Sequence, residues 1–254
     1  MLMVDLKGKT ALVTGATGGM GKEIAYALSK LGMNVCVNYS SEKKEREAGE
    51  IVRGIEKCGT KALAVCADVS NSQEVGAMFK EAHARLGSIF VLVNNAGIYA
   101  AKPGTPLHEV PEEEWDRVMN VNLKGVYLCA REAARQMIAN KGGRIINISS
   151  VVGLRGSRAG AHYAASKAGV IGLTYALADE LGQYGILANS VAPGPVKTKL
   201  LDKLNKTDFE RMRRETPIGR IATEKEIADA VCFFAQTDIV NGQVMVVDGG
   251  RVKH

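Results

Sequence analysis

The sequence predicts a doubly wound α/β fold, with one parallel sheet of about seven strands and helices on both faces. Short apolar runs alternate with longer amphipathic stretches, and most of the runs lack the polar alternation of a sheet with one wet face. No internal repeat or Pro-, Gly- or Ser-rich linker divides the chain. Repeated strand–helix–strand order implies right-handed crossovers, so we predict a single domain over residues 1–254.

The predicted strands are rich in Val, Ile, Leu and Ala, as strands covered on both faces are. They are Thr10–Thr14, Asn34–Asn38, Ala62–Ala67, Ile89–Val93, Arg144–Ser149, Ile186–Val191 and Gln243–Val247. Between them lie the predicted helices Met20–Leu31, Glu42–Lys57, Ser72–Leu86, Glu112–Ala139, Tyr163–Tyr184 and Glu224–Ala235. Ser70 or Asn71 can cap the third helix, with Glu74 placed for a capping box, and Gly32 and Gly59 are typical C-terminal stops.

Composition narrows the class of protein. With 46% hydrophobic and 24% charged residues, the chain of 254 residues is typical of globular proteins. No apolar run reaches the roughly 20 residues of a membrane span, and Met1–Thr10 lacks the apolar core of a signal peptide, so we expect a cytosolic protein without membrane contact. The five cysteines are scattered, which predicts neither disulfides nor a metal site. The net charge of +6 comes from interleaved residues, which does not favour nucleic-acid binding.

A glycine-rich loop follows the first predicted strand. Gly15, Gly19 and Gly21 give the spacing G-x-x-x-G-x-G immediately before the first predicted helix. Such a loop allows a tight turn, close approach of the backbone to a pyrophosphate, and an anion site at the helix N-terminus. The alternative is an ordinary glycine-rich turn, which the position between strand one and helix one disfavours.

The end of the second predicted strand bears on the cofactor. Dinucleotide folds that bind NAD usually place an acidic residue there, whereas this chain reads Asn38-Tyr39-Ser40-Ser41. Nothing in that segment repels a 2′-phosphate, and the basic residues that follow can add charge. This favours NADP. NAD stays the alternative, because Ser40 can equally cap the next helix while the lysines form the solvated face of that helix.

A tyrosine and a lysine share one face of a predicted helix. Tyr163 and Lys167 are four residues apart, and a lysine cation favours the phenolate form of a nearby tyrosine, which moves the tyrosine pKa toward neutral pH. Alone, this spacing occurs by chance on many helices. Other polar residues strengthen the interpretation of Tyr163 and Lys167 as a catalytic pair. Parallel strands present ligand-binding residues at their carboxyl ends, where Ser150 follows the fifth predicted strand and Asn94–Gly97 the fourth, and Asn122 adds an amide within a predicted helix.

At this point the chain resembles the short-chain dehydrogenase/reductase family, in its subgroup of about 250 residues with a Rossmann fold. Within it, the chain looks most like the 3-oxoacyl-carrier-protein reductases. The motifs that carry the resemblance are Thr14–Gly21, Asp68-Val69, Asn94–Gly97, Asn122, Ile148–Ser150, Tyr163 with Lys167, Asn189–Gly194 and Asp248–Gly250, all in family order.

The resemblance implies roles for these residues. Tyr163 is expected to be the acid/base, Ser150 to bind the substrate oxygen, Lys167 to tune Tyr163 and hold the nicotinamide ribose, and Asn122 to position a water in a proton relay. The expected cofactor contacts are Gly15, Thr17, Gly18, Gly19, Met20, Gly21, Asn38, Tyr39, Ser40, Asp68, Val69, Asn95, Ala96, Gly97, Tyr163, Lys167, Pro193, Gly194, Val196 and Thr198. For Asp68, a turn aspartate before the helix is the alternative. No metal is expected.

The substrate class is predicted from the segment that usually forms a lid in this family. Residues 195–214 carry seven basic and three acidic residues, which fits an acidic carrier or a phosphate-bearing thioester, although a solvated amphipathic helix explains them too. The resemblance implies reduction of 3-oxoacyl thioesters on acyl carrier protein or coenzyme A, and Lys141 matches a carrier-docking position. Tyr184 and the run Ile98-Tyr99-Ala100 depart from that subgroup.

Two other functions stay open. A sugar, polyol or small-ketone dehydrogenase of the same family is the runner-up, and a non-catalytic protein that senses the cofactor is the alternative from another class. A homotetramer, or a homodimer, is implied by the resemblance through pairing of the two long helices.

Overall fold

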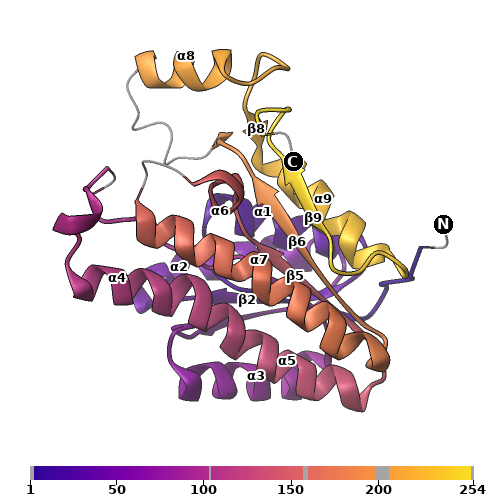
Figure 1. The fold of residues 1–254 in the computed structure, drawn as a ribbon. Helices are drawn as coiled ribbons and strands as arrows, with labels where there is room; N and C mark the ends of the chain where they lie inside the picture. The colour runs from indigo at the N-terminus through magenta and orange to yellow at the C-terminus, as the bar shows by residue number, and fades with distance from the viewer. Residues whose placement is uncertain (1–2, 103, 157–159, 198–205, 253–254) are drawn as a thin grey trace.

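The computed structural model describes residues 3–102, 104–156, 160–197 and 206–252, and it confirms the predicted fold. Seven parallel strands form one sheet in the order β3-β2-β1-β4-β5-β6-β9 (Figure 1). Their bounds are β1 Thr10–Val13, β2 Asn34–Tyr39, β3 Ala62–Cys66, β4 Ile89–Asn94, β5 Gly143–Ile148, β6 Ile186–Pro193 and β9 Val244–Val247. A separate two-stranded ladder pairs β7, Val196–Lys197, with β8, Ala222–Thr223.

The helices connect these strands. They are α1 Gly19–Lys30, α2 Glu45–Glu56, α3 Ser72–Leu86, α4 Glu112–Met119, α5 Gly125–Ala139, α6 Val151–Arg155, α7 Ala161–Leu181, α8 Lys206–Arg214 and α9 Glu224–Gln236. Short 3₁₀ turns lie at Glu42–Lys44, Leu107–Glu109 and Gly182–Tyr184. In Figure 1, α8 stands away from the sheet while the long helices lie along it.

Two hydrophobic cores flank the sheet. Residues of α1, α2 and α9 such as Ile24, Ile51 and Phe234 pack on one face, and residues of α3, α5 and α7 pack on the other. Successive residues of one strand point to opposite cores: Val13 joins the first core and Leu12 the second. Both faces therefore demand apolar side chains, which explains why the strands read as continuous apolar runs.

The chain reverses its direction of winding between β1 and β4. From β1 it proceeds outward through β2 and β3, then returns to place β4 on the other side of β1. The carboxyl ends of β1 and β4 are thus neighbours whose following loops diverge to opposite faces. Open α/β sheets bind ligands at such a switch point, so the topology places a site there.

Local sequence signals set several helix ends. Gly32 and Gly59 adopt the left-handed conformation after α1 and α2, with φ of +83° and +86°, as predicted. The Asn71 side chain caps α3 by accepting from the backbone N–H groups of Gln73 and Glu74. The Glu74 carboxylate accepts from the N–H of Asp68, and not from that of the cap residue, so it fastens the preceding turn and does not complete a capping box.

The predicted helix Glu112–Ala139 is not continuous. A π-helical segment, Asn120–Lys124, separates α4 from α5, and Asn122 lies fully buried inside it. The predicted helix Glu42–Lys57 begins with a 3₁₀ turn, and the helix predicted from Tyr163 begins two residues earlier at Ala161. Periodicity of apolar residues carries little information about such changes of hydrogen bonding, because an inserted residue shifts the helical face only locally.

The segment expected to form a lid lies partly outside the described residues. Residues 198–205, including the predicted cofactor contact Thr198, are not described, whereas β7 and α8 are. Within the described residues, no helix is long and apolar enough to cross a membrane, and no group of His, Cys, Asp and Glu could hold a metal ion. All five cysteines are free thiols.

Candidate active site

The glycine loop lies at the switch point of the sheet, fastened to the end of β4. The hydroxyl Oγ1 of Thr14 accepts hydrogen bonds from the backbone N–H groups of Asn95 and Ala96, both at 3.0 Å. In return, Nδ2 of Asn95 donates to the carbonyl oxygens of Thr14 and Gly15, at 2.9 Å and 3.1 Å. The loops after β1 and β4 therefore form one rigid unit.

The fit of this loop to a dinucleotide rests on space that only glycine leaves. A Cβ atom on Gly15, whose φ is +60°, would lie 2.9 Å from Cα of Ala96, and one on Gly21 would lie 2.5 Å from the carbonyl oxygen of Gly15. Helix α1 begins directly at Gly19 and has no acidic residue in its first turn. A backbone folded this closely at a helix N-terminus suits a pyrophosphate.

One acidic side chain lies against this loop. The carboxylate of Glu224, the first residue of α9, lies against Gly19, where an added Cβ atom would require the Glu224 side chain to move. Sequence reasoning did not predict this contact, because α9 is more than 200 residues away along the chain. A carboxylate beside a helix N-terminus is favourable there, and it competes with other anions for the same position.

The residues predicted to hold the adenosine follow β2 and β3, and their side chains differ in how far their polar groups are already hydrogen-bonded. Oδ1 of Asn38 accepts from the N–H of Gly15 at 3.1 Å, while its amide donates to Val65 and Ala67, so this buried side chain braces the loop. Ser40 is exposed at the end of β2. Asp68 uses Oδ1 to bind the hydroxyl and N–H of Ser70, which is the turn interaction named as its alternative.

Val69 and Tyr39 line the same end of the sheet and are both buried. Val69 packs so closely on the α5 N-terminus that a Cβ on Gly125 would lie 2.8 Å from its Cγ2 atom. On the other side, the buried Pro193 ends β6, and Gly194 donates to the carbonyl of Val247 at 3.0 Å. Val196 is buried in β7. These residues form two walls on either side of the switch point.

The predicted catalytic hydroxyls come together at the end of β5. Ser150 follows that strand with an extended backbone and caps α6, where its Oγ accepts from the N–H of Val152 at 3.2 Å. Tyr163 lies in the first turn of α7 and is buried, and its side chain is close enough to Ser150 for that serine to lower the pKa of the phenol. Two residues that are 13 positions apart in the sequence thus place their hydroxyl groups on the same side of the site, at the end of β5.

Lys167 lies one turn further along α7 and is buried. Its Nζ donates to the carbonyl oxygen of Ile148 at 2.8 Å and lies 5.9 Å from the centroid of the Tyr163 ring. Burial lowers the pKa of Lys167 to about 8. A Cβ on Gly97 would lie 3.4 Å from this ammonium group and 3.3 Å from Oδ1 of Asn122, so the exposed glycine leaves open space next to both groups.

The surroundings of Tyr163 shift its pKa in both directions. Burial raises the pKa of Tyr163 well above the usual value, the neighbouring Tyr99 raises it further, and the hydrogen bond with Ser150 acts in the opposite direction. In this structure the ammonium group of Lys167 is bonded to the carbonyl oxygen of Ile148, and the expectation that it lowers the pKa of Tyr163 stays a prediction.

Asn122 connects the π-helical segment to the loop after β4. Its Oδ1 accepts from the N–H of Ile98 at 2.8 Å, and its Nδ2 donates to the carbonyl of Ile98 at 2.9 Å and to Oγ of Ser166 at 3.2 Å. The amide is thus fully buried and satisfied by residues from two elements beside Tyr163. π-Helical turns are frequent at functional sites, where they redirect a side chain inward.

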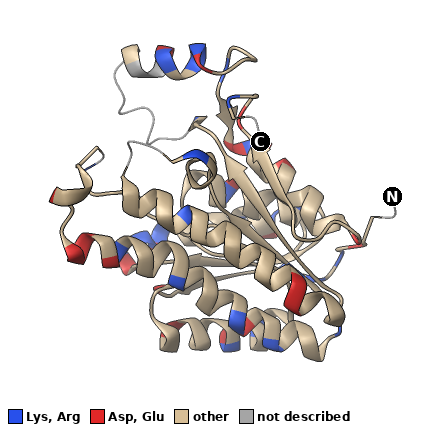
Figure 2. Cartoon of the chain, in the orientation of Figure 1, with Lys and Arg blue, Asp and Glu red and all other residues tan. Residues whose placement is uncertain are grey.

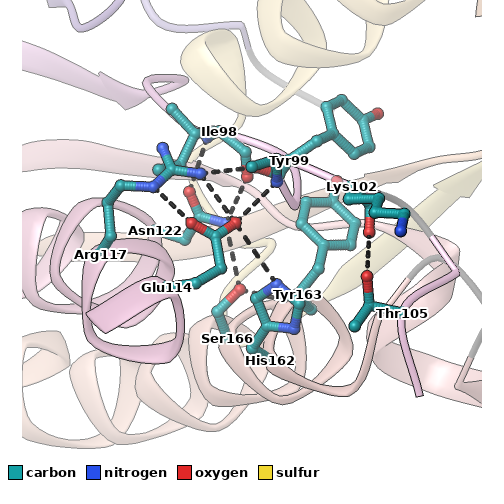
Figure 3. Close-up of polar contacts among 11 residues, drawn as sticks. Ile98, Tyr99, Lys102, Thr105, Glu114, Arg117, Asn122, His162, Tyr163 and Ser166 are labelled. Atoms are coloured by element: carbon teal, nitrogen blue, oxygen red, sulfur yellow. Dashed lines mark hydrogen bonds and ion pairs between the residues drawn. The ribbon is translucent and has the colours of Figure 1, made fainter. Parts of the chain in front are cut away.

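Sequence reasoning missed a polar cluster next to Tyr163, shown in Figure 3. Glu114 and Arg117 of α4 are bonded to each other at 2.7 Å, and Glu114 accepts from the N–H of Ala101 at 2.6 Å. Bonding from Arg117 and Ala101 lowers the pKa of Glu114 to about 2. His162 is buried with Nε2 at 3.8 Å from the Glu114 carboxylate, and within the described residues neither ring nitrogen has a hydrogen-bond partner. No sequence motif marks these residues, since they meet only through the packing of α4 on α7.

Comparison with known proteins decides the family. A family model described as short chain dehydrogenase matches residues 9–208, which is most of the chain. The chain belongs to the short-chain dehydrogenase family. This confirms the predicted resemblance, and family members are oxidoreductases that use a nicotinamide cofactor.

Named relatives extend over nearly the whole chain. A protein of Staphylococcus aureus strain Mu50 named 3-oxoacyl-[acyl-carrier-protein] reductase FabG is 43% identical, covering 95% of this chain and 97% of the relative. One of the same name from Rickettsia felis is 38% identical, covering 98% and 99%. Among solved structures, a putative gluconate dehydrogenase from Agrobacterium tumefaciens superposes with a TM-score of 0.92 at 33% identity, covering 99% of this chain and 98% of that one.

Proposed function

We propose that this protein is an NADP-dependent reductase of 3-oxoacyl thioesters. The observation that carries the reaction class is the convergence of the Ser150 and Tyr163 hydroxyls at the end of β5, beside the buried ammonium group of Lys167. The substrate class is supported by the relatives named 3-oxoacyl-[acyl-carrier-protein] reductase, at 38–43% identity over nearly their whole length.

The loop from Gly15 to Gly21, with Thr17, Gly18, Gly19 and Met20, would hold the pyrophosphate of the cofactor. Asp68 and Val69 would contact the adenine, Asn95, Ala96 and Gly97 the adenosine ribose, and Lys167 the nicotinamide ribose. Pro193, Gly194, Val196 and Thr198 would surround the nicotinamide. When bound, the cofactor supplies the hydride, and the protein orients it and manages the proton.

In the reduction, the Ser150 and Tyr163 hydroxyls would bind the substrate carbonyl oxygen, and Tyr163 would give its proton to that oxygen as it gains negative charge. The phenol of Tyr163 is protonated at neutral pH and so has a proton to give. Lys167, with a pKa of about 8, is still mostly protonated there and would restore the proton through the groups around Asn122.

The cofactor preference depends on the end of β2. Ser40 is exposed there, while Lys44 is paired with Glu47 at 3.1 Å and Arg46 with Glu50 at 3.2 Å, which leaves Ser40 and Lys43 as the groups for a 2′-phosphate. We expect Ser40→Asp to raise KM for NADPH roughly tenfold, about 1.4 kcal/mol, with little change for NADH. Equal loss with both cofactors would contradict the assignment to NADP.

A sugar or polyol dehydrogenase is the second candidate, favoured by the similarity to the putative gluconate dehydrogenase. Figure 2 shows basic residues on α8. They do not decide between the two substrate classes, because the exposed Arg213 is paired with Glu210 at 3.2 Å and Arg211 with Glu215 at 4.0 Å. Oxidation of NADPH with acetoacetyl-CoA should be compared with reduction of NADP by gluconate and sugar alcohols. Turnover of the polyols without any thioester reduction would overturn our proposal.

We also propose that the chain forms a homotetramer or homodimer through α5 and α7. Tyr127 on α5 and Tyr175 on α7 are 46% and 47% exposed in the single chain, as large apolar side chains at an interface would be. Light scattering on the purified protein tests this proposal, and a monomer at micromolar concentration would contradict it.

A further inference from the structure

A second tyrosine lies flat against Tyr163. The rings of Tyr99 and Tyr163 are stacked, with centroids 4.7 Å apart and an angle of 21° between their planes. Figure 3 shows the Tyr99 ring next to that of Tyr163, at the end of the loop that follows β4. Although it covers a buried ring, Tyr99 is itself 51% exposed. One face of Tyr163 is therefore covered by a side chain that borders solvent.

The backbone on both sides of Tyr99 in the sequence is hydrogen-bonded to α4 and to the π-helical segment Asn120–Lys124. Nη2 of Arg117 donates to the carbonyl oxygen of Tyr99 at 3.3 Å, and Glu114 accepts from Ala101 at 2.6 Å. On the other side of Tyr99, both backbone groups of Ile98 are bonded to Asn122. Hydrogen bonds at residues 98, 99 and 101 hold the backbone of this segment, so the Cα atom of Tyr99 is fixed beside Tyr163 while its ring stays half exposed.

This placement has a steric consequence for the substrate. A carbonyl oxygen bound between the Ser150 and Tyr163 hydroxyls brings the two carbons attached to that carbonyl close to the phenol ring. A ring stacked on one face of Tyr163 limits the space for one of these carbons. A methylene group fits against a flat ring, whereas an added methyl group on the same carbon must displace it.

We propose that Tyr99 is a specificity-determining residue that selects ketones unbranched at the carbon next to the reacting carbonyl. The proposal rests on the function proposed above, for which that carbon is the methylene group between the ketone and the thioester. It also explains why residues 98–100 of this chain depart from the reductase subgroup, since Tyr99 lies in that segment.

The experiment compares acetoacetyl-CoA with its α-methylated analogue as substrates for NADPH oxidation. In Tyr99→Ala, the ratio of kcat/KM for the branched over the unbranched thioester should rise about tenfold, since one methyl group in a shaped pocket changes selectivity by about 10-fold to 200-fold. Tyr99→Phe keeps the ring and should retain the wild-type ratio. Tyr184, 40% exposed before β6 at the opposite edge of the sheet, provides the control, and Tyr184→Ala should leave the ratio unchanged.

A ratio within twofold of wild type in a folded Tyr99→Ala, or a Tyr99→Phe that behaves like Tyr99→Ala, would overturn the proposal. A general loosening of the site would lower kcat/KM for both thioesters equally and so would leave the ratio unchanged. If Tyr99→Ala does not fold, Tyr99→Leu removes the flat ring while filling the volume. If wild type reduces neither thioester, the proposed function fails, and the same ratio for isopropyl methyl ketone over methyl ethyl ketone decides the role of Tyr99.

Discussion

The ammonium group of Lys167 donates to the carbonyl oxygen of Ile148 at 2.8 Å. This bond joins α7 to the last residue of β5, two residues before Ser150. It places a positive charge in a buried position, and burial lowers the pKa of that lysine from 10.5 to about 8. The site therefore contains a charge that costs folding free energy at neutral pH.

Replacement of Lys167 should change how the free energy of unfolding depends on pH. Below pH 8 the lysine is charged in both folded and unfolded chains. Between pH 8 and 10.5 the unfolded chain holds more protons, so wild type gains stability as pH rises. The shift corresponds to at most about 3 kcal/mol, which Lys167→Met should not show. Urea denaturation of both proteins from pH 7 to 10 measures this, and parallel pH profiles would contradict it.

Removal of the Tyr163 hydroxyl should abolish turnover and leave the fold intact. Tyr163→Phe keeps the buried ring and its stacking on Tyr99 but has no proton to give, so kcat should fall by about 10²-fold to 10⁴-fold. Tyr184→Phe, in the exposed turn before β6, is the matched control and should keep wild-type kcat. Survival of turnover in a well-folded Tyr163→Phe would show that the assigned mechanism is wrong.

The glycine loop should tolerate no side chain at Gly15. In Gly15→Ala the new Cβ lies in a left-handed residue and 2.9 Å from Cα of Ala96, so we expect a loss of about 1 to 3 kcal/mol in unfolding free energy. Cofactor affinity should fall with it. Gly76→Ala in α3 meets nothing within 4 Å and should instead stabilise the protein by about 0.5 to 1 kcal/mol. Thermal denaturation and NADPH titration of both variants test this contrast.

Asn122 should prove important for stability as well as activity. Asn122→Leu leaves the N–H and carbonyl of Ile98 without their partners, and two such losses cost about 2 to 4 kcal/mol. Ser166→Ala leaves both bonds to Ile98 in place. It removes the third bond of Asn122 and the bond from Oγ of Ser166 to the carbonyl oxygen of Tyr163 at 2.8 Å, and should cost less, about 1 to 2 kcal/mol. Urea denaturation gives the unfolding free energy of both variants, and kcat is measured on the same preparations. Equal stability of the two variants would show that the amide does not hold the loop.

Glu224 should weaken cofactor binding in the wild-type protein. Its carboxylate lies against Gly19, where a pyrophosphate would carry the same charge. Glu224→Gln keeps the size of the side chain and should lower Kd for NADPH twofold to fivefold, corresponding to about 0.3 to 1 kcal/mol. Glu180→Gln, an exposed acid on α7, should leave Kd unchanged. Fluorescence titration at low salt measures both, and weaker binding by Glu224→Gln would refute the expected competition.

The fold could be predicted from the chain because its signals are local. Apolar runs such as Ile89–Val93 identify strands with two buried faces, and Gly32 and Gly59 mark helix ends where only a left-handed residue fits. The motifs around Gly15, Asn95 and Ser150 follow β1, β4 and β5, which are successive strands of the sheet, so strand order alone brings them to one edge. The π-helical segment escaped prediction because it shifts backbone hydrogen bonds without changing the apolar pattern.

The sequence by itself determined the sheet, its winding and the identity of the residues at the switch point, since all of these follow from short-range patterns and from the order of strands. Only the tertiary structure decided what surrounds Tyr163. The stacking of Tyr99, the orientation of Lys167 toward Ile148, and the contacts of Glu114 with His162 and of Glu224 with Gly19 join residues on separate elements. Such contacts depend on how side chains from different helices and loops share a confined space, and no spacing along one chain specifies that.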